Sequence, residues 1–168
     1  GIESITKALS YYQKTNNSTE MARCYFQMGF LYHSLNDSTS AIEYFTRSLK
    51  MNRELNNRPG EAAAIMGLGQ ACLNRKEYEK SREYLLESLA IREQINDWRG
   101  YAASLNAYMT LCLETGKTEE AGEISRKGIK LATELGDKMG IARFMLDLGK
   151  IYLDQKATDK AEQTLLEA

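Results

Sequence analysis

Proline, long apolar runs and an excess of charge of either sign are nearly missing from this 168-residue sequence. The single proline, Pro59, leaves the chain free to form helices, and residues that favour helix are abundant. No segment approaches the roughly 18–20 apolar residues that cross a bilayer, so we expect no membrane insertion. The net charge of -1 gives no bulk attraction to nucleic acid, and we expect no nucleic-acid partner. Alternating β-branched runs are also missing, which argues against strands.

Cysteine and histidine are too few and too scattered to suggest a reactive site. Cys24, Cys72 and Cys112 are odd in number and do not suggest a disulfide framework. We expect buried, apolar roles for Cys72 and Cys112, and a cytoplasmic location for the protein. His33 is the only histidine, and its distance in sequence from Cys24 does not place the two side by side on one helix. We therefore expect no catalytic residue, no metal site and no cofactor.

A short joint recurs at a period of 40 residues. Its copies are Thr15-Asn16-Asn17, Leu55-Asn56-Asn57, Ile95-Asn96-Asp97 and Leu135-Gly136-Asp137. The middle residue is Asn or Gly, which tolerate the left-handed conformation that ends a helix. The last residue is Asn or Asp, both of which are strong N-caps. We expect each joint to end one helix and begin the next, and the fixed period indicates a repeat array.

Columns of small residues also recur at this period. They are Glu20, Gly60, Gly100 and Gly140; then Ala22, Ala62, Ala102 and Ala142; then Gly29, Gly69 and Gly149, with Met109 as the exception. Glycine near a helix start is unfavourable by propensity, so we attribute the first column to close packing against the preceding helix. The alternative for these glycines is phosphate binding at helix N-termini. The mid-helix column lets a neighbouring helix approach closely.

A second break divides each repeat into two helices of roughly 17 residues. We place it at Asn36-Asp37, Arg75-Lys76, Gly116-Lys117 and Lys156-Ala157. Asp37 suits an N-cap and Gly116 suits a helix end. The second helices then begin with the small residues Ala41, Ser81, Ala121 and Ala161. Each repeat is therefore predicted to be a helix hairpin.

The pattern resembles the tetratricopeptide repeat, in the long-helix variety of spindle-orientation adaptors and bacterial signalling and regulatory proteins. The first full repeat carries the resemblance in Tyr25, Met28, Gly29, Tyr32, Ala41 and Phe45. The third departs most, with Met109 for the glycine and Ser125 for the aromatic residue, so we expect looser or rotated packing there. The resemblance implies an all-α fold, an α-solenoid of stacked antiparallel helix hairpins in a right-handed superhelix, with about nine helices.

We expect one array over residues 1–168. It comprises the second helix of a truncated repeat (1–17), full repeats at 18–57, 58–97 and 98–137, and an incomplete repeat at 138–168. Solenoids normally carry atypical capping repeats at their ends, and neither end has one. We therefore predict that the chain is a fragment of a longer protein.

The resemblance further implies a non-catalytic scaffold that binds a protein or peptide in a concave groove lined by the first helix of each repeat. The candidate lining residues are Arg23, Phe26, Gln27, Phe30, His33, Met66, Gln70, Asn74, Asn106, Thr110, Leu113, Arg143, Asp147 and Lys150. Phe26 and Phe30, one turn apart, are either apolar anchors or ordinary inter-helix core. Arg143 and Lys150 either receive a carboxylate or pair with Asp147.

The residues leave two other functions open. One is a regulatory or sensor segment of a larger signalling protein, such as a kinase, a cyclase or a transcription regulator. The other is a self-association module in which exposed helical ends stack between copies. Trp98, the single tryptophan, lies in a column of polar residues and either forms a binding hot spot or covers a helix end.

Overall fold

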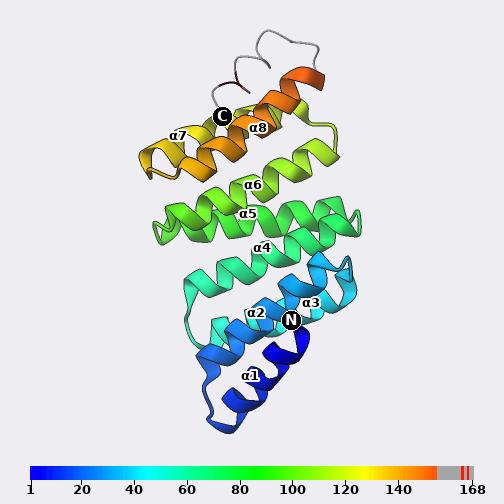
Figure 1. The fold of residues 1–168 in the computed structure, drawn as a ribbon, viewed down its shortest axis with the longest axis vertical. Coiled ribbons are helices and arrows are strands. Elements are labelled where there is room, and N and C mark those ends of the chain that lie inside the picture. The colour runs from blue at the N-terminus through cyan, green and yellow to red at the C-terminus, as the bar shows by residue number, and fades with distance from the viewer. Residues whose placement is uncertain (155–163, 165, 167–168) are drawn as a thin grey trace. The chain divides into compact units, whose positions relative to one another are not determined.

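The computed structural model describes residues 1–154, 164 and 166, and within them it contains eight α-helices and no strand (Figure 1). The helices are α1 (Ile2–Lys14), α2 (Ser18–Ser34), α3 (Ser38–Glu54), α4 (Arg58–Asn74), α5 (Tyr78–Gln94), α6 (Trp98–Glu114), α7 (Thr118–Glu134) and α8 (Lys138–Asp154). The predicted all-α class is confirmed, and α2 to α8 each have the expected 17 residues. The predicted break at Lys156-Ala157 and the ninth helix, with Ala161, lie outside the described residues.

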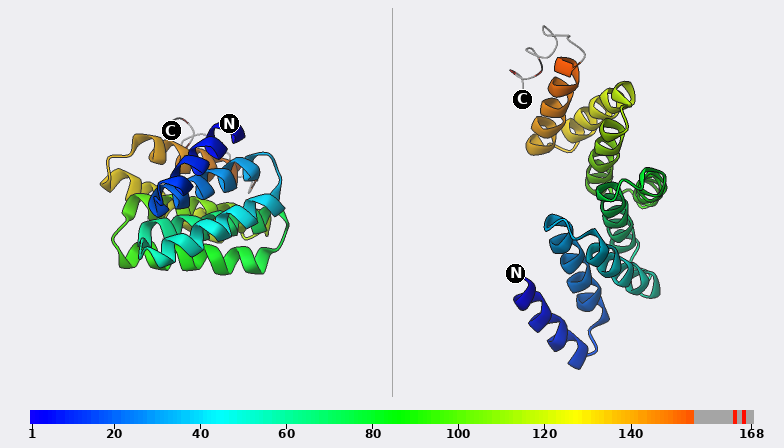
Figure 2. Two further views of the ribbon diagram at one scale, coloured as in Figure 1. Left: turned by 90° about the horizontal axis from the view of Figure 1, so that it is seen from below. Right: turned by 90° about the vertical axis from the view of Figure 1, so that its right-hand side faces the viewer.

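The helices form two compact units, Gly1–Asp97 and Trp98–Ala168. In the first unit each of α1 to α4 packs against the next helix along the chain, and α2 also contacts α4. In the second unit α6 packs against α7, and α7 against α8. Consecutive helices within a unit run in opposite directions (Figure 2). Each unit is therefore a stack of antiparallel helix hairpins, which is the arrangement of an α-solenoid.

The joints end and begin helices as predicted. Their middle residues are left-handed, with φ of 50° at Asn16, 52° at Asn56, 55° at Asn96 and 66° at Gly136. The next residue caps the following helix through its side-chain oxygen, which accepts from the backbone N–H three residues on. The N···O distances are 3.2 Å at Asn17, 3.3 Å at Asn57 and 3.0 Å at Asp137. Each such bond satisfies one of the N–H groups that a helix start leaves unpaired.

The second break lies one residue later in the second repeat than Arg75-Lys76, so that prediction is wrong there. Arg75 has an ordinary φ of -85°, whereas Lys76 is left-handed with a φ of 60°, and Glu77 immediately precedes α5. The equivalent left-handed residues in the other repeats are Asn36 and Gly116. Asparagine and glycine adopt the left-handed conformation more readily than other residues, so they indicate it in a sequence. Lysine gives no such signal, so the residue types place the helix end one position too early.

Replacing Lys76 with glycine should stabilise the protein by up to about 1 kcal/mol. A left-handed backbone costs an ordinary L-residue roughly 1–2 kcal/mol, and the greater freedom of glycine in the unfolded chain offsets part of the gain. Arg75→Gly is the matched control and should destabilise by roughly 0.5–1 kcal/mol, because Arg75 has no such strain. Thermal unfolding followed by circular dichroism measures both. A melting temperature for Lys76→Gly at or below the parent's would contradict the prediction.

Bulky buried side chains lie against the mid-helix glycines Gly29, Gly67 and Gly69. A Cβ added to Gly29 would lie 2.6 Å from Cδ1 of Phe45, and one added to Gly67 would lie 2.6 Å from Cε1 of the same ring. Phe45 is fully buried. In the next repeat, a Cβ on Gly69 would lie 2.8 Å from Cγ of Leu85. Glycine at these positions therefore lets the first helices pack directly against the bulky residue of a second helix.

In the third repeat the bulky residue lies on the first helix and the small residue on the second. Met109 of α6 stands where the other repeats have Gly29 and Gly69, and Ser125 of α7 stands where they have Phe45 and Leu85. Met109 is 1% exposed and Ser125 is fully buried, and Ser125 Oγ donates to Met109 Sδ at 2.9 Å. The side chain that α7 lacks is thus supplied by α6. The expectation of looser or rotated packing between these two helices stays a prediction.

The glycines behind the joints have no room for a side chain. A Cβ on Gly60 would overlap Oδ1 of Asn52, on the preceding helix α3. A Cβ on Gly140 would lie 2.5 Å from Oδ2 of Asp137 and 3.2 Å from Cβ of Ala132. Close packing against the preceding helix is therefore confirmed at these two glycines.

Candidate functional site

The predicted lining residues of the first unit all reach the surface of α2 and α4. Arg23, Gln27, Phe30 and Asn74 are exposed, and Phe26, His33, Met66 and Gln70 are half-buried. Because α2 contacts α4, these side chains belong to neighbouring helices of one stack. The helical periodicity that selected them therefore places them on an accessible face rather than in the core.

His33 and Asn74 join the two helices of this face. Asn74 Nδ2 lies 3.3 Å from His33 Nδ1. Burial lowers the pKa of His33, which favours the neutral ring, and a neutral Nδ1 can accept from the amide. Cys24 is buried on the same helix, and burial raises the pKa of its thiol, so it lacks the character of a nucleophile. His33 therefore links α2 to α4 at the surface of the first unit.

The two phenylalanines of α2 have different surroundings. Phe26 is half-buried, and its ring centroid lies 5.6 Å from that of the core residue Phe45. Phe30, one turn further along, is 57% exposed. Phe26 therefore covers the edge of the core, whereas Phe30 is an aromatic side chain available to a partner.

In the second unit the predicted charged residues lie on α8. Lys150 Nζ is 3.3 Å from Asp147 Oδ1, so one of the two considered pairs forms. The Arg143 side chain is exposed, and within the described part of the chain it makes no ion pair. On α6, Asn106 is half-buried and Thr110 is exposed, with Thr110 Oγ1 donating to the Asn106 carbonyl at 3.1 Å. Arg143 is thus an exposed cation on α8.

Trp98 keeps part of its ring in solvent, at 39% exposure. Its ring meets that of Tyr101 edge to face, with centroids 6.0 Å apart. Tyr101 is buried in the first turn of α6. This contact supports the interpretation that Trp98 covers a helix end.

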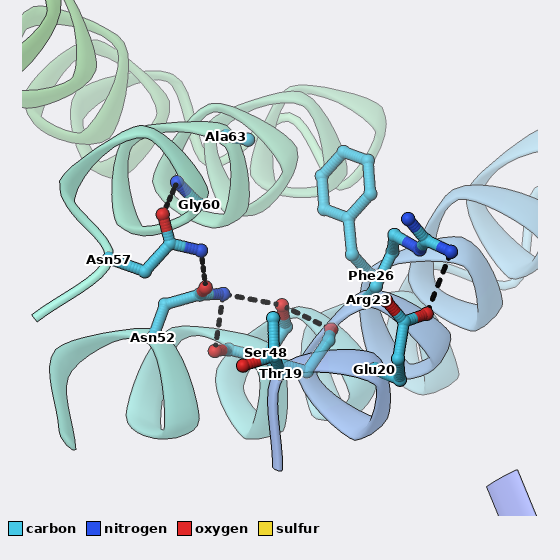
Figure 3. A pocket seen from close by; sticks show the side chains of 10 residues that line it. Thr19, Glu20, Arg23, Phe26, Ser48, Asn52, Asn57, Gly60 and Ala63 are labelled. Carbon is cyan, nitrogen blue, oxygen red and sulfur yellow. Dashed lines mark hydrogen bonds and ion pairs between the residues drawn. The ribbon is translucent and has the colours of Figure 1, made fainter. Parts of the chain in front are cut away.

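A pocket between α2, α3 and α4 was missed by the sequence analysis (Figure 3). Its volume is about 200 Å³. Two predicted lining residues, Arg23 and Phe26, border it, and Ala63 borders it from α4. Small residues next to a joint were visible in the sequence, but periodicity does not show that a gap opens between two first helices. The pocket therefore adjoins the predicted face and reaches inward to residues of α3.

Hydrogen bonds engage the polar groups at the bottom of this pocket. Ser48 Oγ donates to the Ala22 carbonyl at 2.9 Å, and Asn52 Nδ2 donates to the Ser48 carbonyl at 2.9 Å. Asn57 Nδ2 donates to Asn52 Oδ1 at 2.7 Å, and Asn57 Oδ1 accepts from the Gly60 N–H. Over the described residues, no buried side-chain nitrogen or oxygen lacks a partner. The side chains at the bottom of the pocket are therefore polar, but they already have hydrogen-bond partners within the protein.

The described residues contain no group of three or more His, Cys, Asp or Glu side chains that could hold a metal ion. In the same part of the chain, no helix has the length and apolar character that a membrane crossing needs. Cys24, Cys72 and Cys112 are buried free cysteines, which confirms the burial predicted for Cys72 and Cys112.

Antiparallel helix hairpins with an accessible first-helix face define a helical-repeat scaffold. Sequence models of the tetratricopeptide repeat match residues 22–55 and 61–134, which together make up more than half of the chain. The chain belongs to the tetratricopeptide repeat family. The fold is that of a protein-interaction scaffold.

Solved structures of the same fold cover nearly all of this chain. BtubC (BKLC) from P. vanneervenii has a TM-score of 0.80 at 16% identity, covering 98% of this chain and 71% of that one. A Rap protein complexed with competence and sporulation factor has a TM-score of 0.80 at 18% identity, covering 99% and 57%. A signal-transduction ATPase with a tetratricopeptide repeat sensor, from Pyrococcus horikoshii, has a TM-score of 0.77 at 18% identity, covering 99% and 26%.

This chain thus spans only part of each of those proteins. Identities this low show a shared fold. A search of curated proteins found no match.

Proposed function

We propose that this chain binds an extended or helical segment of another protein, without catalysis, on the faces that the first helices of the repeats present in each unit. These helices are α2 and α4 in the first unit and α6 and α8 in the second. The observation that carries the proposal is the 57% exposure of Phe30 among polar side chains of α2. Exposed aromatic residues with polar surroundings are typical of interfaces.

The mechanism is burial of the segment against a preformed surface. Phe30 supplies an apolar anchor, with the edge of Phe26 beside it. Gln27 and Asn106 offer hydrogen bonds that set the register of the backbone, and Arg143 offers two parallel donors to a carboxylate. The similar Rap structure holds a bound factor, which supports binding as the use of such a fold.

Peptides selected from a displayed random library against the parent protein test this proposal. The double variant Phe30→Ala/Arg143→Ala should bind the selected peptides at least about tenfold more weakly, because truncating an anchor residue commonly costs more than 1 kcal/mol. Leu86→Ala on the second helix α5, where Leu86 is 43% exposed, is the matched control and should bind like the parent. Fluorescence polarisation measures all three affinities. Equal affinity for the double variant and the parent would place the site elsewhere.

A sensor segment of a larger signalling protein is the second candidate function. The archaeal ATPase with a tetratricopeptide repeat sensor supports it, and this chain corresponds to 26% of that protein. The coding sequence around residues 1 and 168 tests it directly. End-to-end self-association and a cytoplasmic location stay predictions. Sedimentation at several concentrations tests the first, and microscopy of a tagged protein tests the second.

A further inference from the structure

We infer that the pocket between α2 and α4 receives one aromatic side chain of the bound peptide, an inference that rests on the proposed function. The pocket has a volume of about 200 Å³. An apolar protein cavity of roughly 150 Å³ is already large enough to admit benzene. The space therefore suits a phenyl or phenol group and exceeds what a methyl group would fill.

The walls of the pocket favour an apolar occupant. Ala22 and Ala63 present methyl groups, and Phe26 presents its ring. Figure 3 shows the Phe26 ring on one side of the pocket and Asn57 with Gly60 on the other. Aromatic rings attract one another in offset or edge-to-face arrangements with centroids about 4.5–7 Å apart, so Phe26 selects an aromatic over an aliphatic group.

The bottom of the pocket offers little to a polar occupant. Ser48, Asn52 and Asn57 each donate a side-chain proton to another protein group. A charged or sugar-like ligand would lose its hydration, and its hydrogen bonds to these side chains would compete with the ones already formed. An aromatic ring loses little hydration and covers a hydrogen-bonded surface that already has its partners.

The rim provides the contacts that a peptide backbone needs. Arg23 Nη2 lies 2.7 Å from Glu20 Oε2, and the Arg23 side chain is 67% exposed. A guanidinium has five N–H groups, so donors remain for carbonyl groups on either side of the aromatic residue. Phe30 lies on the same face of α2 one turn beyond Phe26, which continues the apolar path along the helix.

Titration with N-acetyl-4-fluoro-L-phenylalaninamide, followed by fluorine NMR, tests the pocket directly. The parent should show saturable binding in the millimolar range expected for so small a ligand. Ala63→Leu fills the pocket and should weaken binding by about tenfold or more. Ala103→Leu makes the same change at the exposed counterpart on α6 and should bind like the parent. No saturable binding to the parent, or equal binding to Ala63→Leu, would overturn the inference.

A measurement on the parent alone removes any dependence on how well the variant folds. Ring protons of the bound amide should show nuclear Overhauser contacts to the Ala63 methyl group. A bound amide whose contacts all lie elsewhere would also overturn the inference.

The library-selected peptides separate this inference from the proposed function. We expect both Ala63→Leu and Phe30→Ala/Arg143→Ala to weaken their binding, and alanine in place of the peptide's aromatic residue to do the same. If only the double variant weakens binding, the pocket inference is wrong and the proposed function stands. If the double variant binds like the parent, both fail.

Discussion

Asp97→Asn should lower the free energy of unfolding by about 3 kcal/mol, because it leaves a buried guanidinium without its counter-ion. Arg92 is 6% exposed, and its Nη1 lies 2.7 Å from Asp97 Oδ2. Removing one partner of a buried ion pair costs about 3–5 kcal/mol. We take the lower end because the Asp97 side chain is 29% exposed. Asparagine is as good an N-cap as aspartate, so the change tests the charge rather than the cap.

The preceding repeat supplies the matched control for this experiment. Asn52 and Asn57 occupy the equivalent positions and are joined by a neutral hydrogen bond of 2.7 Å. The double variant Arg92→Asn/Asp97→Asn transplants this pair and should recover most of the stability that Asp97→Asn loses. Urea denaturation followed by circular dichroism measures both. An unchanged midpoint for Asp97→Asn, or a double variant no more stable than the single one, would contradict the ion-pair account.

Phe45→Ala should cost about 4 kcal/mol of stability, within the range for a truncated core phenylalanine. The ring is fully buried and lies against Gly29 and Gly67, with its centroid 5.6 Å from that of Phe26. Two of these neighbours are glycines, which have no side chain to move into the vacated space. The cavity therefore stays largely open, and the loss lies in the upper part of the range.

Two other substitutions make this second prediction specific. Phe45→Leu copies the residue at the equivalent position, Leu85, and should cost roughly 1.5 kcal/mol or less. Phe30→Ala removes a ring that is 57% exposed and should change stability by no more than about 0.5 kcal/mol. The same urea titration distinguishes the three. A loss on Phe30→Ala comparable with that of Phe45→Ala would make Phe30 a core residue and would contradict its proposed role as an anchor.

The helix boundaries were largely predictable because each depends on one or two residues. Asn56 and Asn57 show this most simply, since the first adopts a left-handed backbone and the second accepts from the N–H of Gly60. The failure at Lys76 follows from the same rule. The conformation there is imposed by the geometry between two helices, and a lysine does not reveal it.

The exposed side of the candidate binding helices was predictable, whereas the burial of single residues on it was not. Helical spacing placed Gln27 on the exposed side of α2, because the two sides of a helix follow from residue order alone. For Phe26 and Phe30 it left both an anchor and a core position open. It could not separate the half-buried Phe26 from the exposed Phe30, since that difference depends on the ring of Phe45 in the next helix.

Residue order was therefore sufficient to predict the all-α class, the positions where helices end and begin, and the exposed side of the first helices. All three depend on interactions within a few residues. The pocket and the exchange between Met109 and Ser125 required contacts across helices. Ser48 reaches a carbonyl 26 residues away, and Ser125 reaches a sulfur 16 residues away. Such contacts depend on which side chains meet after the helices have packed, and packing density, rather than local preference, determines that match.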